Sequence, residues 1–268
     1  MKRLMQLFFL FFITTQCLNA QSSRTFYIGL GGSNSSFQDL KYSSLRYGGM
    51  GGVFELHFKN SNENRIWKTG LTLTGNREAA SLFDNGKAWA IYPQIHFSYL
   101  KSINEQLYIG GRWDVMEMYI RQTSGLGNNS IYYNTGSYLS ASGLYKLTIK
   151  DQKFDISLDL GVLSYFKEST GFAFSAAQNA LEDGEFDYQD EALTNPFGFK
   201  YFEVRPIWQH FRMSTAIDYQ IGKRLSVGYR WNMRRFSEVE DRAVTTGANT
   251  ISIRYHITHK RPETVIPD

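Results

Sequence analysis

Cysteine is nearly absent from this sequence, and proline is scarce. The single cysteine, Cys17, lies near the N-terminus, and only five prolines occur in 268 residues. If the first twenty residues are removed on export, as argued next, the remaining chain has no thiol, which excludes disulfides and cysteine chemistry. Neither positive nor negative charge is in large excess. The formal net charge of +4 is small and scattered, which argues against nucleic acid as a partner.

Long apolar runs are missing except for one at the start. A short basic stretch is followed by an apolar run up to Thr15 and by small and polar residues up to Ala20. This order predicts a secretory signal peptide over residues 1–20. The run is shorter than the roughly 20 residues of a transmembrane helix, and no later run is longer, so none is expected in the mature chain. Lipidation of Cys17 is the lesser alternative, because the residues before it do not fit that signal.

Aromatic residues, by contrast, are abundant. They make up 16% of the chain, yet the mean hydropathy is −0.36. A transmembrane β-barrel reconciles the two values, because only alternate strand residues face lipid while lumen and loops stay polar. Trp and Tyr concentrate at the membrane interfaces of such a barrel.

Apolar and polar residues alternate with a period of two along most of the chain. The clearest segment is 224–234, where five large apolar residues occupy one face and three arginines lie on the other. Since a wet lumen accepts arginine at little cost, we interpret the apolar face as lipid-facing. Similar alternation is found in 67–74, 89–99, 137–149, 154–162, 211–221 and 251–258, and more weakly in the glycine-containing segments near residues 26–33, 48–58 and 107–114.

The connections between these segments alternate between short and long. Short ones are predicted at 60–64, 102–105, 151–152 and 222–223, and long ones at 34–46, 76–87, 121–135, 167–205 and 237–247. This alternation indicates an even number of strands with both termini in the periplasm. The predicted fold is all-β, one closed antiparallel up-and-down transmembrane β-barrel over residues 21–268. About ten strands are expected, with eight or twelve as alternatives.

These features, in this order, resemble the small outer-membrane β-barrel proteins of Gram-negative bacteria over essentially the whole mature chain. The resemblance is one of architecture, without a motif specific to one protein. It implies a location in the cell outer membrane, in contact with outer-membrane lipid and lipopolysaccharide. Members usually end on an aromatic residue of the last strand, whereas this strand ends near Thr258. We interpret residues 259–268 as a periplasmic tail.

Charges of both signs occupy the predicted inward positions. In a narrow ten-stranded lumen we expect them to pair with one another and nearly to close the passage, although a narrow conduit lined by charge is an alternative. The predicted ion-pair network comprises Lys146, Asp155, Asp159, Arg212, Asp218, Arg230, Arg234 and Arg254, and other inward charged or imidazole groups are Glu55, His57, Lys68, His96, Arg112, Asp114 and His256.

The tightest connection predicts how part of this network is arranged. With the turn at residues 151–152, Lys146 falls opposite Ser157 and has Asp155 and Asp159 as diagonal neighbours. We therefore expect this lysine to bridge the two aspartates.

Enzyme signals are weak, and no catalytic residue is predicted. His96 and Ser98 have the His-x-Ser spacing of outer-membrane lipid hydrolases, but they face inward near the periplasmic end. Gln209 and His210 resemble the Asp-His pair of omptin proteases, but glutamine replaces the acid that would orient the imidazole.

The longest predicted loop, 167–205, is extracellular and carries an acidic cluster. Such carboxylates could bind calcium, but their order departs from an EF-hand, and we favour a solvated acidic segment. Neither a metal site nor a cofactor is predicted. The cluster consists of Glu182, Asp183, Glu185, Asp187, Asp190 and Glu191.

Three functions remain open at this point. The first is a non-enzymatic barrel with a largely plugged lumen, whose outer loops contact a surface protein, a glycan or lipopolysaccharide. The second is a narrow passive or selective channel, and the third is a surface hydrolase of unknown type. A soluble barrel of lipocalin type would require polar outer faces, which 154–162 and 224–234 do not have.

Overall fold

The computed structural model describes residues 23–40, 46–80, 87–124, 130–170, 202–237 and 243–260. The predicted signal peptide, the acidic cluster of the long loop and most of the tail lie outside these residues. The strands are β1 (Ser23–Asp39), β2 (Arg46–Ser61), β3 (Arg65–Ala80), β4 (Lys87–Ser102), β5 (Leu107–Ser124), β6 (Ser130–Ile149), β7 (Gln152–Thr170), β8 (Glu203–Pro206), β9 (His210–Gln220), β10 (Leu225–Phe236) and β11 (Val244–Lys260).

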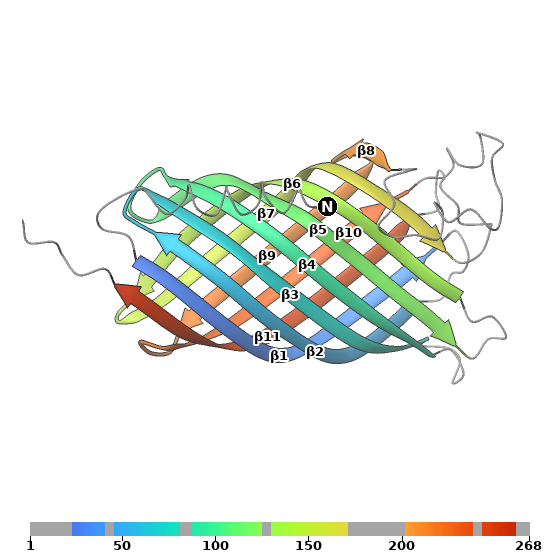
Figure 1. Ribbon diagram of the computed structural model, residues 1–268, viewed down its shortest axis with the longest axis horizontal. Helices are drawn as coiled ribbons and strands as arrows, with labels where there is room; N and C mark the ends of the chain where they lie inside the picture. Colours follow the sequence, from blue (N-terminus) through green and yellow to red (C-terminus); the bar gives the residue numbers. More distant parts are fainter. Residues whose placement is uncertain are drawn as a thin grey trace, which may run out of the picture.

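Ten of these strands close into one antiparallel barrel. Each pairs with its neighbours in the chain, and the first strand, β1, pairs with the last, β11, which closes the ring. The remaining strand, β8, is four residues long and pairs with the far part of β7, beyond the stretch that pairs with β9. Figure 1 shows the strands winding obliquely around the barrel. The predicted fold class is confirmed.

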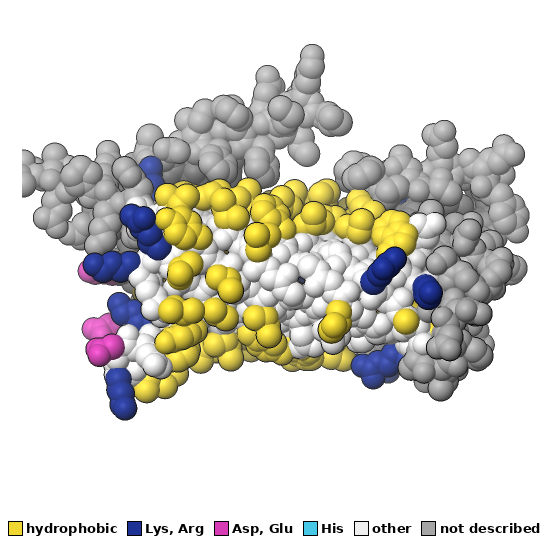
Figure 2. Space-filling model, turned by 90° about the horizontal axis from the view of Figure 1, so that it is seen from below, with side chains coloured by type: hydrophobic (Ala, Val, Ile, Leu, Met, Phe, Trp, Pro, Cys, Tyr) yellow, Lys and Arg dark blue, Asp and Glu magenta, His cyan; other side chains and the backbone are white. Residues whose placement is uncertain are grey.

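The outer wall exposes large apolar side chains. Leu30 and Ile253 are 64% and 61% exposed, and they lie side by side on neighbouring strands. On the face shown in Figure 2, apolar side chains cover much of the barrel wall, and charged side chains gather toward its two ends. A bare apolar wall around a polar interior is stable only in lipid, and closed barrels of this kind belong to the outer membrane. The predicted location is therefore confirmed.

No helix among the described residues is long and apolar enough to cross a bilayer.

Most strands are longer than the alternation in the sequence predicts. β6 has 20 residues and β7 has 19, because pairing continues past the point where the outward residues stop being apolar. The long connections are correspondingly shorter than predicted. Residues 167–170 and 203–205 of the predicted long loop belong to β7 and β8, and residues 259–260 of the predicted tail belong to β11.

Short connections gather at one barrel end, which we call the short-turn end. Asparagine side chains build two of them. The Oδ1 atom of Asn62 accepts hydrogen bonds from the backbone amides of Asn64 and Arg65, at 3.0 and 2.8 Å. Asn104 does the same for Gln106 and Leu107, at 2.9 and 2.7 Å. Such side-chain caps stabilise tight turns between adjacent strands.

The hairpin between β6 and β7 corrects one prediction. Its turn is Lys150–Asp151, with a φ of 54° at Lys150, so Ile149 pairs with Gln152. A two-residue hairpin turn favours this positive φ, and it moves the turn one residue earlier than the sequence predicts. As a result Lys146 lies opposite Asp155 rather than opposite Ser157.

Glycine permits close strand contact at two inward positions. A Cβ atom on Gly31 would lie 1.9 Å from the carbonyl oxygen of Ile251, and one on Gly51 would lie 1.8 Å from that of Gly75. Because a larger residue would collide with the backbone there, these glycines allow β1 to lie close to β11 and β2 to lie close to β3.

The lipid-facing assignment predicts unequal effects at adjacent positions of β7. Leu158 is 47% exposed on the outer wall, whereas its neighbour Ser157 faces the lumen. Leu158→Arg should destabilise the folded protein by about 2 to 4 kcal/mol, and Ser157→Arg should have a smaller effect. Urea unfolding in lipid vesicles measures both values. Equal losses in the two variants would contradict the assignment.

Candidate functional site

The lumen contains two apolar layers separated by charged groups. The layer at the short-turn end lies on β3 to β6 and consists of Ile66, Leu100, Tyr108 and Leu144. The larger layer lies toward the opposite end and is rich in aromatic rings. It comprises Phe37, Tyr47, Ala80, Ala90, Tyr119, Tyr138, Phe166, Phe236 and Val244.

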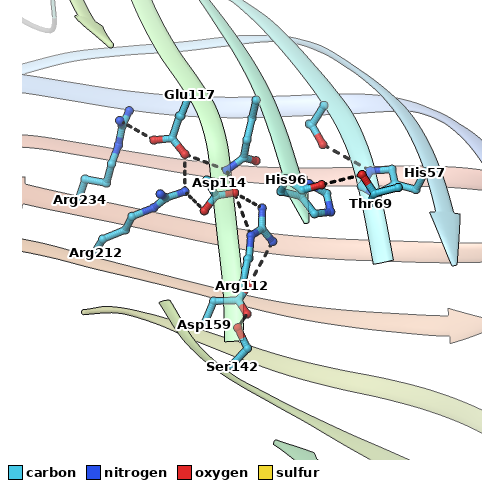
Figure 3. A network of polar contacts seen from close by, with 12 residues as sticks. His57, Thr69, His96, Arg112, Asp114, Glu117, Ser142, Asp159, Arg212 and Arg234 are labelled. Carbon is cyan, nitrogen blue, oxygen red and sulfur yellow. Dashed lines mark hydrogen bonds and ion pairs between the residues drawn. The ribbon is translucent and has the colours of Figure 1, made fainter. Parts of the chain in front are cut away.

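Six charged residues between these layers form what we call the central cluster. Three are arginines and three are carboxylates, so the cluster is electrically balanced. They come from four strands, β5, β7, β9 and β10, and therefore connect different sides of the barrel (Figure 3). The members are Arg112, Asp114, Glu117, Asp159, Arg212 and Arg234.

Glu117 holds two arginines of the cluster together. Its Oε1 atom lies 2.8 Å from Nη1 of Arg234, and its Oε2 atom pairs with Nη2 of Arg212. Gln94 donates to the same Oε2 atom at 2.8 Å. The carboxylate is fully buried, so these three donors replace the water that it would have outside. Glu117 thereby links β5 to β9 and β10 across the lumen.

Asp114 and Asp159 are joined by one arginine. Arg112 donates from Nε and Nη2 to Oδ1 of Asp114, at 2.9 and 2.8 Å, and its Nη1 lies 3.1 Å from Oδ2 of Asp159. The Oγ atom of Ser142 donates to Oδ1 of Asp159 at 2.6 Å. The planar guanidinium suits such a bridge, because its donors point in fixed directions toward two acceptors.

A β-bulge places Glu117 in the lumen and explains why sequence analysis missed it. Strict alternation after Asp114 would put Met116 inward and Glu117 outward. On β6, however, Asp114 pairs with Tyr138 and Glu117 pairs with Gly136, so two residues of β5 oppose one residue of β6. An extra residue of this kind reverses the facing of every residue after it.

Aromatic rings of the lumen lie beside the arginines. The guanidinium carbon of Arg212 is 4.5 Å from the ring centre of Tyr138, and that of Arg234 is 4.9 Å from the ring centre of Tyr92. Cation–π attraction adds to the ion pairs when such contacts exclude water.

Arg254 and Glu55 form a second ion pair. The Nη2 atom of Arg254 lies 3.0 Å from Oε1 of Glu55, its Nη1 atom pairs with Asp218, and Ser252 donates to Glu55 at 2.8 Å. Gly228 provides the space, because a Cβ there would lie 2.5 Å from the guanidinium carbon of Arg254.

A third pair lies on strand segments that were predicted to be loops. The Nε atom of Arg121 is 3.0 Å from Oε2 of Glu78, and Ser35 donates to Oε1 of Glu78 at 2.8 Å. Because the apolar alternation ends before these positions, no signal in the sequence marked Arg121 and Glu78 as lumen residues.

Lys146 does not bridge Asp155 and Asp159, so that prediction was wrong. Its ammonium donates to the hydroxyl of Tyr108 at 3.0 Å and lies 4.2 Å from the ring centre. Asp155 pairs instead with Lys59 at 3.2 Å, and Asp159 belongs to the central cluster. The observed register puts Lys146 directly opposite Asp155, yet Asp155 pairs with Lys59 of β2 on the other side of the lumen, and Asp159 pairs with Arg112 of β5.

Arg230 and Lys68 face the lumen, and neither forms an ion pair within the parts of the chain that the structure describes. The Nε atom of Arg230 is buried without a hydrogen-bond partner. His57 and His96 also lie inside the barrel, with ring centres 4.9 Å apart. His256 contacts Ser226, with Nε2 and Oγ 2.6 Å apart.

His96 and His210 are the two histidines whose spacing was compared with enzyme sites in the sequence. Neither has a carboxylate that orients its ring among the described residues. Nδ1 of His96 and both ring nitrogens of His210 are buried without a hydrogen-bond partner. His210 is instead enclosed by the rings of Tyr138, Phe166 and Phe236, at 5.5, 4.5 and 5.0 Å. Over the same described ranges, no three His, Cys, Asp or Glu residues are grouped to hold a metal ion. The acidic cluster of the long loop lies outside these ranges.

Two small cavities adjoin the central cluster. One of about 40 Å³ lies toward the aromatic layer and touches Tyr92, Tyr119 and Arg234. The other, of about 10 Å³, touches Gln94 and Asp114. Both are of the size that holds individual water molecules.

No protein-family model matches this chain, and no curated protein matches its sequence. Similar solved structures include the translocator domain of the autotransporter NalP from Neisseria meningitidis, at 8% identity and a TM-score of 0.49, covering 94% of each chain. The outer membrane protease OmpT from Escherichia coli has 7% identity and a TM-score of 0.47, covering 92% of this chain and 100% of its own. Ail, the attachment invasion locus protein of Yersinia pestis, has 10% identity and a TM-score of 0.37, covering 89% and 100%.

Removing the acid between two arginines should strongly destabilise the barrel. In Glu117→Ala, Arg212 and Arg234 remain buried without this carboxylate, so we expect a loss of about 3 to 5 kcal/mol in the free energy of unfolding. Glu105→Ala, in an exposed turn, is the control and should change little. Urea unfolding monitored by tryptophan fluorescence measures both variants. A Glu117→Ala protein as stable as the control would contradict the role assigned to the cluster.

The corrected contacts of Lys146 make a second prediction. Lys146→Met leaves the partners of Asp155 and Asp159 in place, so it should cost at most about 1 kcal/mol. Arg112→Met removes the shared partner of two buried carboxylates and should cost several times more. The same unfolding measurement ranks the variants, and the reverse order would favour the arrangement first predicted from the sequence.

Proposed function

We propose that this protein is a non-conducting outer-membrane barrel that anchors partner-binding segments at the cell surface. The observation that carries the proposal is the central cluster, in which Glu117 bridges arginines from two other strands. Breaking such an interior ion pair to pass solute is costly, because each buried charge would lose its partner. The apolar layers on either side add to the barrier.

The long strands also support an anchoring role. A strand of 19 residues, such as β7, covers roughly 50 Å along the barrel axis at the usual tilt, against an apolar band of about 25 Å. Part of the barrel wall therefore projects beyond the lipid. With the short turns in the periplasm, as is usual for these barrels, the projecting ends face outward.

The connection over residues 171–202 follows one of these projecting strands. It is far longer than the two to five residues that join adjacent strands in a hairpin, and connections of this length usually have a function. We propose that it binds a surface protein, a glycan or lipopolysaccharide, and that the barrel has no catalytic role.

A narrow channel is the competing proposal, and conductance distinguishes the two. The purified protein in a planar bilayer should show no unitary current steps. Replacing Glu117, Arg212 and Arg234 together by Ala should open the lumen and produce steps. Arg235→Ala is the matched control, because this neighbouring arginine faces outward and should leave the bilayer silent. Steps in the unmodified protein would overturn the non-conducting proposal.

The anchoring role makes a separate prediction about residues 175–195. Replacing them by a short Gly/Ser linker should preserve assembly, seen as the usual shift in gel mobility on heating, because surface connections tolerate changes of length. Surface cross-linking in intact cells should then recover fewer partners. An unchanged set of partners with normal assembly would place the function in the barrel wall instead.

A further inference from the structure

Eight inward charges that lie nearer the short-turn end than the central cluster are not balanced. They form what we call the cationic group, in which five cations face three carboxylates. The cations are Lys59, Lys68, Lys146, Arg230 and Arg254, and the carboxylates are Glu55, Asp155 and Asp218. The central cluster is neutral, so it does not offset the two excess positive charges of the cationic group.

All three carboxylates of the cationic group are already engaged. Arg254 holds Glu55 and Asp218, and Lys59 holds Asp155. Lys146 has no ion pair either, but its ammonium donates to the hydroxyl of Tyr108. Arg230 and Lys68 are therefore the two cations of the group with neither an ion pair nor a side-chain hydrogen bond in the described parts of the chain. An unpaired charge in a barrel interior is unfavourable, so a mobile anion from solution would stabilise it.

A buried imidazole, that of His96, lies on the strand next to Lys68. Lys68 of β3 pairs with Ser98 of β4, so His96, two residues before Ser98, is a diagonal neighbour of Lys68 on the lumen side. Both Arg230 and Lys68 are within electrostatic reach of His96. His96 is 3% exposed, and its Nδ1 atom has no hydrogen-bond partner. The ring of His57 contacts the ring of His96, and His57 is itself stacked on Tyr27 with ring centres 4.6 Å apart. His96 is therefore a positioned polar group with a free hydrogen-bonding atom.

Solvent reaches this region from the short-turn end. The apolar layer at this end lies on β3 to β6, and the polar groups that follow belong to β2, β7 and β9. The side chains of Lys59, Asp155 and Asp218 are 25%, 28% and 30% exposed. Lys68 and Arg230 are themselves partly exposed. An ion in the periplasm can thus approach the two unpaired cations without passing the central cluster.

We propose that Arg230, Lys68 and His96 bind a phosphate-type oxyanion that enters from the periplasmic end. A phosphate group carries nearly two negative charges at neutral pH, which matches the excess. It offers several acceptor oxygens to a guanidinium, an ammonium and an imidazole N–H, whereas chloride offers one charge and no fixed geometry. This inference goes beyond the proposed surface function, and it holds whether or not the outer segments bind a partner.

The test is a titration of the full-length folded protein with inorganic phosphate. The protein is held in a maltoside detergent, which has no phosphate, at constant ionic strength set with chloride. Isothermal titration calorimetry should show one saturable site, and the thermal unfolding midpoint should rise with phosphate concentration. A parallel titration with glycerol phosphate distinguishes free phosphate from a phosphate monoester as the ligand.

Variants assign the site to these residues. Arg230→Gln should weaken phosphate binding at least tenfold, and Lys68→Met provides a second variant if the first does not fold. Arg235→Gln, on the outer face of the same strand, is the matched control and should bind as the unmodified protein does. The proposal is overturned if phosphate gives neither saturable heat nor a midpoint shift. It is also overturned if folded Arg230→Gln or Lys68→Met protein binds as well as the control.

Discussion

A charged side chain inside a ten-stranded barrel has little access to bulk water, and leaving it without a partner of opposite charge costs free energy. The interior of this protein satisfies that requirement by pairing its charges. Glu117 is fully buried, yet it meets two arginines and an amide donor. Arg112 similarly serves two aspartates from different strands. Because the partners come from different sides of the wall, satisfying each charge also fixes the shape of the barrel.

The distribution of charge along the lumen separates two regions with different chemistry. The central cluster is neutral and lies next to the aromatic layer, so nothing in its composition requires an external ion. The cationic group nearer the short turns keeps an excess of positive charge and is partly wet. A barrier and a binding region can therefore coexist in one lumen, since each depends on different residues.

Small backbone irregularities decide which residues take part in this arrangement. The bulge after Asp114 turns Glu117 inward, and the positive φ at Lys150 sets the register of the β6–β7 hairpin. Each involves one or two residues, but each changes the partners of every charge that follows on its strand. Without the bulge, Arg212 and Arg234 would lack their shared acid.

The sequence by itself determined the closed barrel of about ten strands, the alternation of short and long connections and the facing of regular strands such as β10, whereas the pairing of the strands decided the count of ten. These features follow from a period-two pattern that is local in the chain. Only the tertiary structure decided which charges pair. Lys59 meets Asp155 across the lumen, and Arg254 meets Glu55 over the intervening strand β1. Both pairs join strands distant in sequence, so no local pattern contains that information. The facing of Glu117 and the inward position of Arg121 also required the paired strands, because register and bulges are set by the neighbouring strand rather than by the residues themselves.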